Sequence, residues 1–136
     1  MVLKIYTDGG SKGNPGPASI GIVFYLGNQT IFRHKESIGI ATNNDAEYTA
    51  LIRALENIKS QIKNLKTPSP ISKLEFYSDS RLMVNQVNGL FKVKNGKIKE
   101  YVLRIRTLEQ EVNLPISYQN IPREQNVEAD RLVNEV

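Results

Sequence analysis

Carboxylates at four points of the chain are the side chains best suited to chemistry: Asp8, Glu47, Asp79 and Asp130. The first follows an apolar, β-prone run, residues 2–7, and stands where a glycine- and proline-rich turn begins. Residues 73–78 repeat this pattern and lead into Asp79. A strand fixes an acid at its end, and a glycine-rich loop beside it lets a bulky, charged ligand approach the backbone. Asp8 and Asp79 are therefore candidates for one shared site.

An acidic cluster of this kind points to metal chemistry. Carboxylates held a few ångströms apart repel one another, so the cluster is tolerable only if divalent cations neutralise it. The chain has no cysteine and one histidine, so the ligands must be oxygen atoms, and magnesium or manganese is the expected metal. Two such ions about 4 Å apart would clamp the attacking water and the leaving oxygen of a phosphodiester. The pattern thus predicts nuclease chemistry.

Two of the acids also have ordinary structural interpretations. Asp8 and Gly9 form a dipeptide that often starts a β-hairpin. Glu47 is the third residue after Asn44, so the two fit a capping box in which Asn44 caps a helix and Glu47 reaches back to it. The spacing fits a capping role for Glu47 and a role in a shared acidic site equally well, and both interpretations stay open at this point.

The order of the predicted elements places Asp8, Glu47 and Asp79 at one end of the sheet, and Asp130 could join them from the start of the last helix. Strands are predicted, in chain order, over residues 2–7, 19–25, 30–39 and 73–78. The first three form an antiparallel meander, and a helix with apolar residues from Ala46 to Ile58, then a connector of residues 63–72, lead to the fourth. A right-handed crossover sets the fourth strand parallel to the first, about 4.8 Å away. Asp8 and Asp79 would then be neighbours at the switch point where ligands bind in open α/β sheets.

The second half of the chain adds helices, a strand and a basic loop. Its predicted elements are a short helix over residues 81–87, an amphipathic helix over 98–112, a fifth strand over 114–119 and a last helix that carries Asp130. The predicted loop over residues 89–99 carries Lys92, Lys94, Lys97 and Lys99. This loop fits a phosphate-contacting edge and an ordinary solvated surface equally well.

Composition limits the number of domains, the kind of partner and the location expected for the chain. A chain of 136 residues with 40% hydrophobic content predicts a single domain over residues 1–136. Its net charge of +4 mildly favours a polyanionic partner. No apolar run approaches the roughly 20 residues of a membrane span, so no membrane partner and a cytoplasmic location are expected. His34 stands between Arg33 and Lys35 and is predicted to be a solvated residue of the third strand.

The sequence resembles the ribonuclease H type 1 family over essentially its whole length. Four segments carry the resemblance in the family's order. They are Thr7-Asp8-Gly9-Gly10-Ser11 with Gly13-Asn14-Pro15-Gly16-Pro17, Thr42-Asn43-Asn44-Asp45-Ala46-Glu47, Tyr77-Ser78-Asp79-Ser80, and Asn126-Val127-Glu128-Ala129-Asp130. The resemblance implies an α/β ribonuclease H-like fold, a mixed five-stranded sheet of order 3-2-1-4-5 flanked by helices. Strands one to three would be antiparallel, and strands four and five parallel.

The resemblance also implies an activity. The chain would cleave the RNA strand of RNA/DNA hybrids as a monomer, leaving 5′-phosphate and 3′-hydroxyl ends, with double-stranded RNA as a further candidate substrate. Contacts to 2′-hydroxyls in the minor groove could tell the RNA strand from the DNA strand. The implied metal ligands for two Mg²⁺ ions, or Mn²⁺ in their place, are Asp8, Glu47, Asp79 and Asp130; the implied groove contacts are Asn14, Asn43 and Asn44.

Three departures from the family pattern change these expectations. Many members carry a histidine in the loop before the last acid, where this chain has Arg123 and Glu124, which become candidates for its auxiliary role. Arg81 replaces a glutamine common two positions after the third acid, and it could contact the groove or a phosphate. Residues 92–99 are too short to hold the basic helix that several bacterial members use as a substrate handle, which predicts weaker substrate binding.

Two other functions fit the same pattern. A non-catalytic nucleic-acid-binding module of this fold is the main alternative, and the presence of all four acids argues against it. A detached nuclease domain of a reverse transcriptase would share the chemistry and differ only in context.

Overall fold

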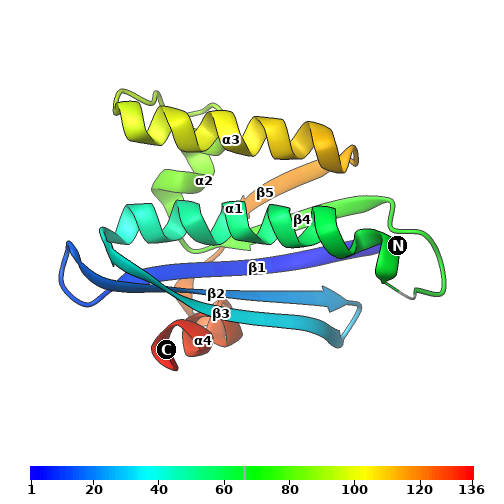
Figure 1. The fold of residues 1–136 in the computed structure, drawn as a ribbon. Coiled ribbons are helices and arrows are strands. Elements are labelled where there is room, and N and C mark those ends of the chain that lie inside the picture. The colour runs from blue at the N-terminus through cyan, green and yellow to red at the C-terminus, as the bar shows by residue number, and fades with distance from the viewer. Residues whose placement is uncertain (66) are drawn as a thin grey trace.

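A five-stranded sheet with helices on both faces forms the protein (Figure 1). The computed structural model describes residues 1–65 and 67–136, so Lys66, within the predicted connector, lies outside the described residues. Helix α1 lies on one face of the sheet with α3 packed on α1, and α4 lies on the opposite face. The elements are β1 (Val2–Ser11), β2 (Gly16–Leu26), β3 (Gln29–Ala41), α1 (Asn43–Gln61), η1 (Ile62–Asn64), β4 (Lys73–Ser78), α2 (Arg81–Val87), α3 (Gly96–Val112), β5 (Ile116–Asn120), η2 (Arg123–Gln125) and α4 (Val127–Asn134).

The predicted sheet topology is confirmed. The strand order is β3-β2-β1-β4-β5, with β1 antiparallel to β2, and β4 parallel to both β1 and β5. The parallel ladder between β1 and β4 ends at the pair Tyr6–Tyr77. Asp8 and Asp79 each stand two residues beyond this pair, which places both acids just past the last rung of the ladder.

The first strand is longer than predicted. β1 continues through Asp8 to Ser11 because β2 pairs with it as far as Ala18. Gly9 serves close packing rather than a turn, since a Cβ there would lie 2.3 Å from the carbonyl carbon of Ala46 on α1. The hairpin interpretation of Asp8 and Gly9 is therefore wrong, and the chain reverses after Ser11 instead.

The N-cap of helix α1 is Thr42, two residues before the predicted cap. Thr42 Oγ1 accepts a hydrogen bond from the Asp45 backbone N–H at 3.0 Å, and the Asp45 carboxylate accepts one from the Thr42 N–H at 3.4 Å. These two bonds form the capping box, so the predicted box of Asn44 and Glu47 is wrong. The prediction from residue spacing chose the wrong cap because Thr42 and Asn43, which can also cap a helix, directly precede Asn44. Glu47 is left to project from the buried face of α1.

Helix α3 also begins earlier than predicted and shortens the lysine loop. Asn95 caps it by accepting N–H groups from Lys97 and Ile98, so Lys97 and Lys99 belong to the helix rather than to the loop. Residues 88–95 pass from α2 to α3 without a further helix, as predicted. The helix then packs on α1 through buried residues such as Ile105.

Helix α4 approaches the sheet at a glycine. A Cβ at Gly21 on β2 would lie 2.3 Å from the carbonyl oxygen of Ala129, so only a glycine lets this helix come so near. Ala129 and Leu132 pack against Val23, and the next turn of the helix is anchored by Ser19, whose hydroxyl donates to the Val133 carbonyl at 2.8 Å. This docking brings Asp130 of α4 close to Asp8 of β1.

His34 lies on β3 away from the acids. Its ring is half-buried beside Phe32, with Nε2 3.0 Å from a Glu36 carboxylate oxygen.

Within residues 1–65 and 67–136, every helix is too short or too polar to cross a bilayer.

Candidate active site

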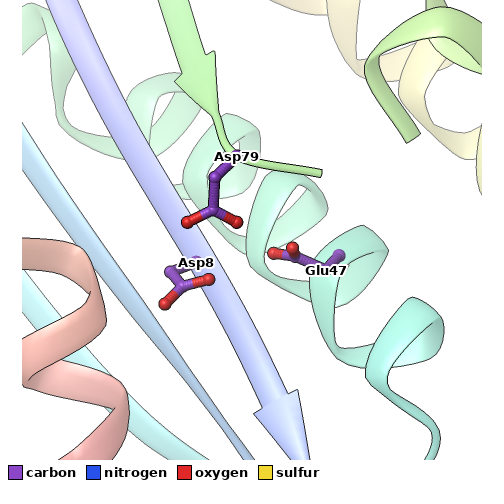
Figure 2. A group of neighbouring side chains, drawn as sticks. All are labelled: Asp8, Glu47 and Asp79. Atoms are coloured by element: carbon purple, nitrogen blue, oxygen red, sulfur yellow. The ribbon is translucent and has the colours of Figure 1, made fainter. Parts of the chain in front are cut away.

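Three carboxylates meet at the end of the parallel ladder (Figure 2). Asp8 comes from β1, Glu47 from α1 and Asp79 from the residue after β4. Each offers one carboxylate oxygen, and these oxygens lie within 4.8 Å of one another. An all-oxygen group of this kind fits a hard divalent cation, so the cluster could hold a metal ion.

Packing between α1 and β1 fixes the position of Glu47. This residue is 8% exposed, and its Oε1 accepts a hydrogen bond from the Gly9 backbone N–H at 2.8 Å. Glycine at position 9 permits this contact because it lets the helix backbone reach the strand. The bond occupies one Glu47 oxygen and orients the carboxylate toward Asp8 and Asp79 (Figure 2).

Burial and mutual repulsion disfavour ionisation of Asp8 and Glu47. Burial, followed by the charges of Asp79 and Asp130, raises the pKa of Asp8 from its ordinary 3.8 to about 8. Burial, followed by the charges of Asp8 and Asp79, also raises the pKa of Glu47 well above its ordinary value. Bound cations would reverse both effects, because a positive charge favours the ionised carboxylates.

Asp130 lines the same cleft from α4 but lies outside the three-residue cluster. It is half-buried, and its charge still contributes to the raised pKa of Asp8. Arg123 also lines the cleft, with Nη2 3.5 Å from an Asp130 carboxylate oxygen and most of its side chain exposed. Glu124 is exposed on η2, outside the residues that line the cleft.

Two of the three predicted asparagines, Asn43 and Asn14, have oriented amide groups, and Asn43 lines the cleft that the acids form. The cleft has a volume of about 330 Å³. Asn43 lines it, and its carboxamide oxygen accepts hydrogen bonds from the backbone N–H and the hydroxyl of Ser11 at 2.9 and 3.2 Å. The Asn14 carboxamide oxygen accepts from the Asn43 backbone N–H at 3.0 Å. Because both oxygens have partners within the protein, both NH₂ groups can donate to a ligand.

The third predicted asparagine and three of the predicted lysines line a second cleft, and Arg81 is not among its lining residues. Asn44, Gln86 and three lysines, Lys92, Lys94 and Lys97, line a second cleft of about 470 Å³ between the starts of α1 and α3. Lys97 Nζ lies 3.3 Å from an Asp45 carboxylate oxygen, so part of its charge is already neutralised. Arg81 begins α2 with its guanidinium 5.7 Å from the centre of the Phe91 ring.

No role was predicted for two residues that organise the site, Ser11 and Asn126. Ser11 orients Asn43, and Asn126 is buried against Asp79. Both belong to segments that carried the family resemblance. Neither residue type nor spacing marks them as functional, since a serine in a glycine-rich segment and an asparagine before a helix are common structural residues.

The fold and the acidic cluster define an α/β protein with a carboxylate centre fit for a metal ion. The model of the RNase H family matches residues 2–136, and the chain belongs to this family. It is 36% identical to the bifunctional protein Rv2228c of Mycobacterium tuberculosis, over 99% of this chain and 35% of that protein. It is also 36% identical to ribonuclease HI of Halobacterium salinarum, over 98% of this chain and 63% of that protein.

The chain thus spans about a third of the length of the first of these relatives and less than two thirds of the second. Among solved structures, LC11-RNase H1 in complex with an RNA/DNA hybrid superposes with a TM-score of 0.89 and is 41% identical. That match covers 98% of this chain and 95% of LC11-RNase H1.

Proposed function

We propose that this chain is a metal-dependent endonuclease that hydrolyses the RNA strand of RNA/DNA hybrids. The observation that carries the proposal is the convergence of Asp8, Glu47 and Asp79 at a cleft that also presents amide donors. Membership of the RNase H family supports it, as does the likeness to LC11-RNase H1, whose structure contains an RNA/DNA hybrid.

Four acids would hold the metal in this proposal. Asp8, Glu47 and Asp79 form the cluster, and Asp130 completes it from α4. Two Mg²⁺ or Mn²⁺ ions would supply an activated water and stabilise charge on the leaving oxygen. Only ionised carboxylates ligate such ions, so Asp8 and Glu47 must release the protons that burial favours. Water attacks phosphorus and the bond to the 3′ oxygen breaks, which leaves a 5′-phosphate and a 3′-hydroxyl.

Substrate recognition would use the oriented amides. Asn14 and Asn43 present NH₂ donors, and the minor groove of a hybrid offers acceptors in 2′-hydroxyls and base edges. Asn44 and Arg81 would contact the substrate farther along the groove or at a phosphate. The exposed Lys92 and Lys94 would face a phosphate at the second cleft.

Arg123 would serve as the auxiliary group of the loop before α4. Its guanidinium lies beside Asp130 at the mouth of the cleft, where it can meet a departing phosphate or replace a leaving cation. Glu124 is a weaker candidate for the same role because it does not line the cleft.

An assay with three substrates tests the proposal. Labelled RNA/DNA hybrid, double-stranded RNA and double-stranded DNA are each incubated with Mg²⁺, Mn²⁺ or a chelator, and the product ends are identified. The expected result is cleavage of the hybrid's RNA strand with either metal, none in chelator, and 5′-phosphate ends. Binding of hybrid without cleavage would instead show a non-catalytic module, and undiminished cleavage in chelator would exclude the metal mechanism.

A further inference from the structure

Asn126 occupies the N-cap position of α4 without capping it. An asparagine there usually accepts a hydrogen bond from an N–H of the first helical turn. In this protein its side chain makes no such bond, and the residue is 1% exposed. The carboxamide is therefore used elsewhere, toward the strand ends that carry the acids.

The contacts of Asn126 join three of the four acid-bearing segments. Its Nδ2 donates to the Thr7 carbonyl at 2.9 Å and to the Asp79 carboxylate at 3.3 Å. Its backbone carbonyl accepts a hydrogen bond from the Asp130 N–H at 3.1 Å. One residue thus touches the neighbour of Asp8, the carboxylate of Asp79 and the backbone of Asp130.

Both partners of the amide nitrogen are acceptors, so only the NH₂ side of the carboxamide can face them. The opposite oxygen, Oδ1, is buried and has no hydrogen-bond partner within the described part of the chain. A buried acceptor without a partner lowers the stability of the folded state, because it has given up its hydrogen bonds to water. A role in folding alone does not explain why this loss of stability is retained. A role in holding the Asp79 carboxylate in one orientation explains it.

We propose that Asn126 is a positioning residue that fixes the Asp79 carboxylate for cation binding. This inference rests on the proposed metal-binding function of the cluster. A neutral amide holds the carboxylate without adding positive charge, whereas a lysine or arginine at this position would compete with a cation. Residues that orient metal ligands in this way typically contribute about 10- to 100-fold to metal affinity or activity.

The test compares Asn126→Leu with the parent and with Asn120→Ala. Leucine has similar volume and removes both donated bonds together with the unpaired acceptor. Asn120 is the matched control, since its Nδ2 donates to the Ser78 carbonyl at 3.1 Å, one residue before Asp79, without touching an acid. The measurements are calorimetric Mn²⁺ binding without nucleic acid, hybrid cleavage across Mn²⁺ concentrations, and crystal structures of the metal-free variants.

The expected result for Asn126→Leu is a roughly 10- to 100-fold loss of Mn²⁺ affinity and a displaced Asp79 side chain. Its cleavage should be partly restored by excess Mn²⁺ at an unchanged KM for hybrid, while Asn120→Ala should match the parent. Parent-like Mn²⁺ affinity, or an unmoved Asp79 in a folded variant, would overturn the inference. If the leucine variant does not fold, Asn126→Ser takes its place, because its shorter side chain falls short of Asp79.

The parent protein separates the two proposals. A parent that neither binds Mn²⁺ nor cuts hybrid refutes the proposed function, and the metal-free structures then decide by themselves whether Asn126 holds Asp79. A parent that binds and cuts, with parent-like values for Asn126→Leu, refutes only the positioning role.

Discussion

At the scale of single residues, a substitution of Asp79 tests whether its carboxylate serves the metal site or serves folding. It accepts a hydrogen bond from Asn126 and lies within 4.8 Å of two other carboxylates. Asp79→Asn should leave the metal-free protein equally stable or stabilise it by up to about 2 kcal/mol, because repulsion among the acids falls. Cleavage should drop by on the order of a thousandfold, since an amide cannot balance the charge of the ions.

Thermal melts in chelator measure the change in stability, and single-turnover cleavage in Mg²⁺ measures the loss of activity, on the same variants. Glu75→Gln is the matched control, because Glu75 lies on the same β4 strand, pairs with Lys73 at 3.4 Å and is remote from the cleft. An Asp79→Asn protein that melts well below the parent and cuts hybrid at a similar rate would show that Asp79 is structural.

The titration of Asp8 predicts an unusual pH dependence of stability. Its pKa rises to about 8 in the folded protein from 3.8, so between these values the folded state binds more protons than the unfolded state. The metal-free protein should therefore lose stability as pH rises from about 4 to about 8, by up to about 1.4 kcal/mol per pH unit for this one group. Denaturant unfolding in chelator measures the slope, and Asp8→Asn should flatten it. A parent whose stability rises steadily with pH over this range would contradict the raised pKa.

At the scale of elements, the short connection from α2 to α3 carries the basic surface of the second cleft. Replacing Lys92 and Lys94 by glutamine should raise KM for hybrid more than it lowers kcat, because in the proposed complex the two lysines would contact phosphates away from the reacting bond. For each lysine that no longer neutralises a phosphate, the slope of log affinity against log salt should become shallower by about 0.9.

Cleavage kinetics and binding at several salt concentrations measure these changes. The control replaces Lys59 and Lys63, near the opposite end of α1, by glutamine, which removes the same charge away from the cleft. An unchanged KM and salt slope in the Lys92 and Lys94 variant would show that the loop is a solvated surface only.

At the scale of the whole molecule, cation binding should be linked to folding. The residues of the cluster come from β1, α1 and the end of β4, so unfolding would separate them and cations would bind only the native state. Mn²⁺ at about 100 times its dissociation constant should then stabilise the protein by about 2.7 kcal/mol at each site, visible as a rise in Tm. Asp8→Asn should abolish most of this rise while Glu75→Gln retains it. Equal Tm values in Mn²⁺ and chelator would contradict a native metal site.

The sequence by itself determined the antiparallel arrangement of the first three strands and the parallel placement of β4 beside β1. Alternation and turn residues marked the strands, and crossover handedness placed β4 beside β1, because these signals are local or follow from chain geometry. Asp8 and Asp79 were predicted as neighbours for this reason, and the structure places their carboxylates in one cluster. Topology placed Glu47 at the same end of the sheet, and the resemblance to ribonuclease H supplied what spacing could not, the expectation that Glu47 is a metal ligand.

Tertiary packing decided the rest. Whether Glu47 caps α1 or faces the site depended on where the helix begins, and Thr42 decided this. Gly9 looked like a turn residue, yet its missing side chain is what lets α1 reach β1. The proposed role of Asn126 depends on its contacts with Asp79, which lies 47 positions earlier in the chain, and with Thr7, which lies 119 positions earlier. No local pattern encodes such contacts, because they form only when distant segments pack together.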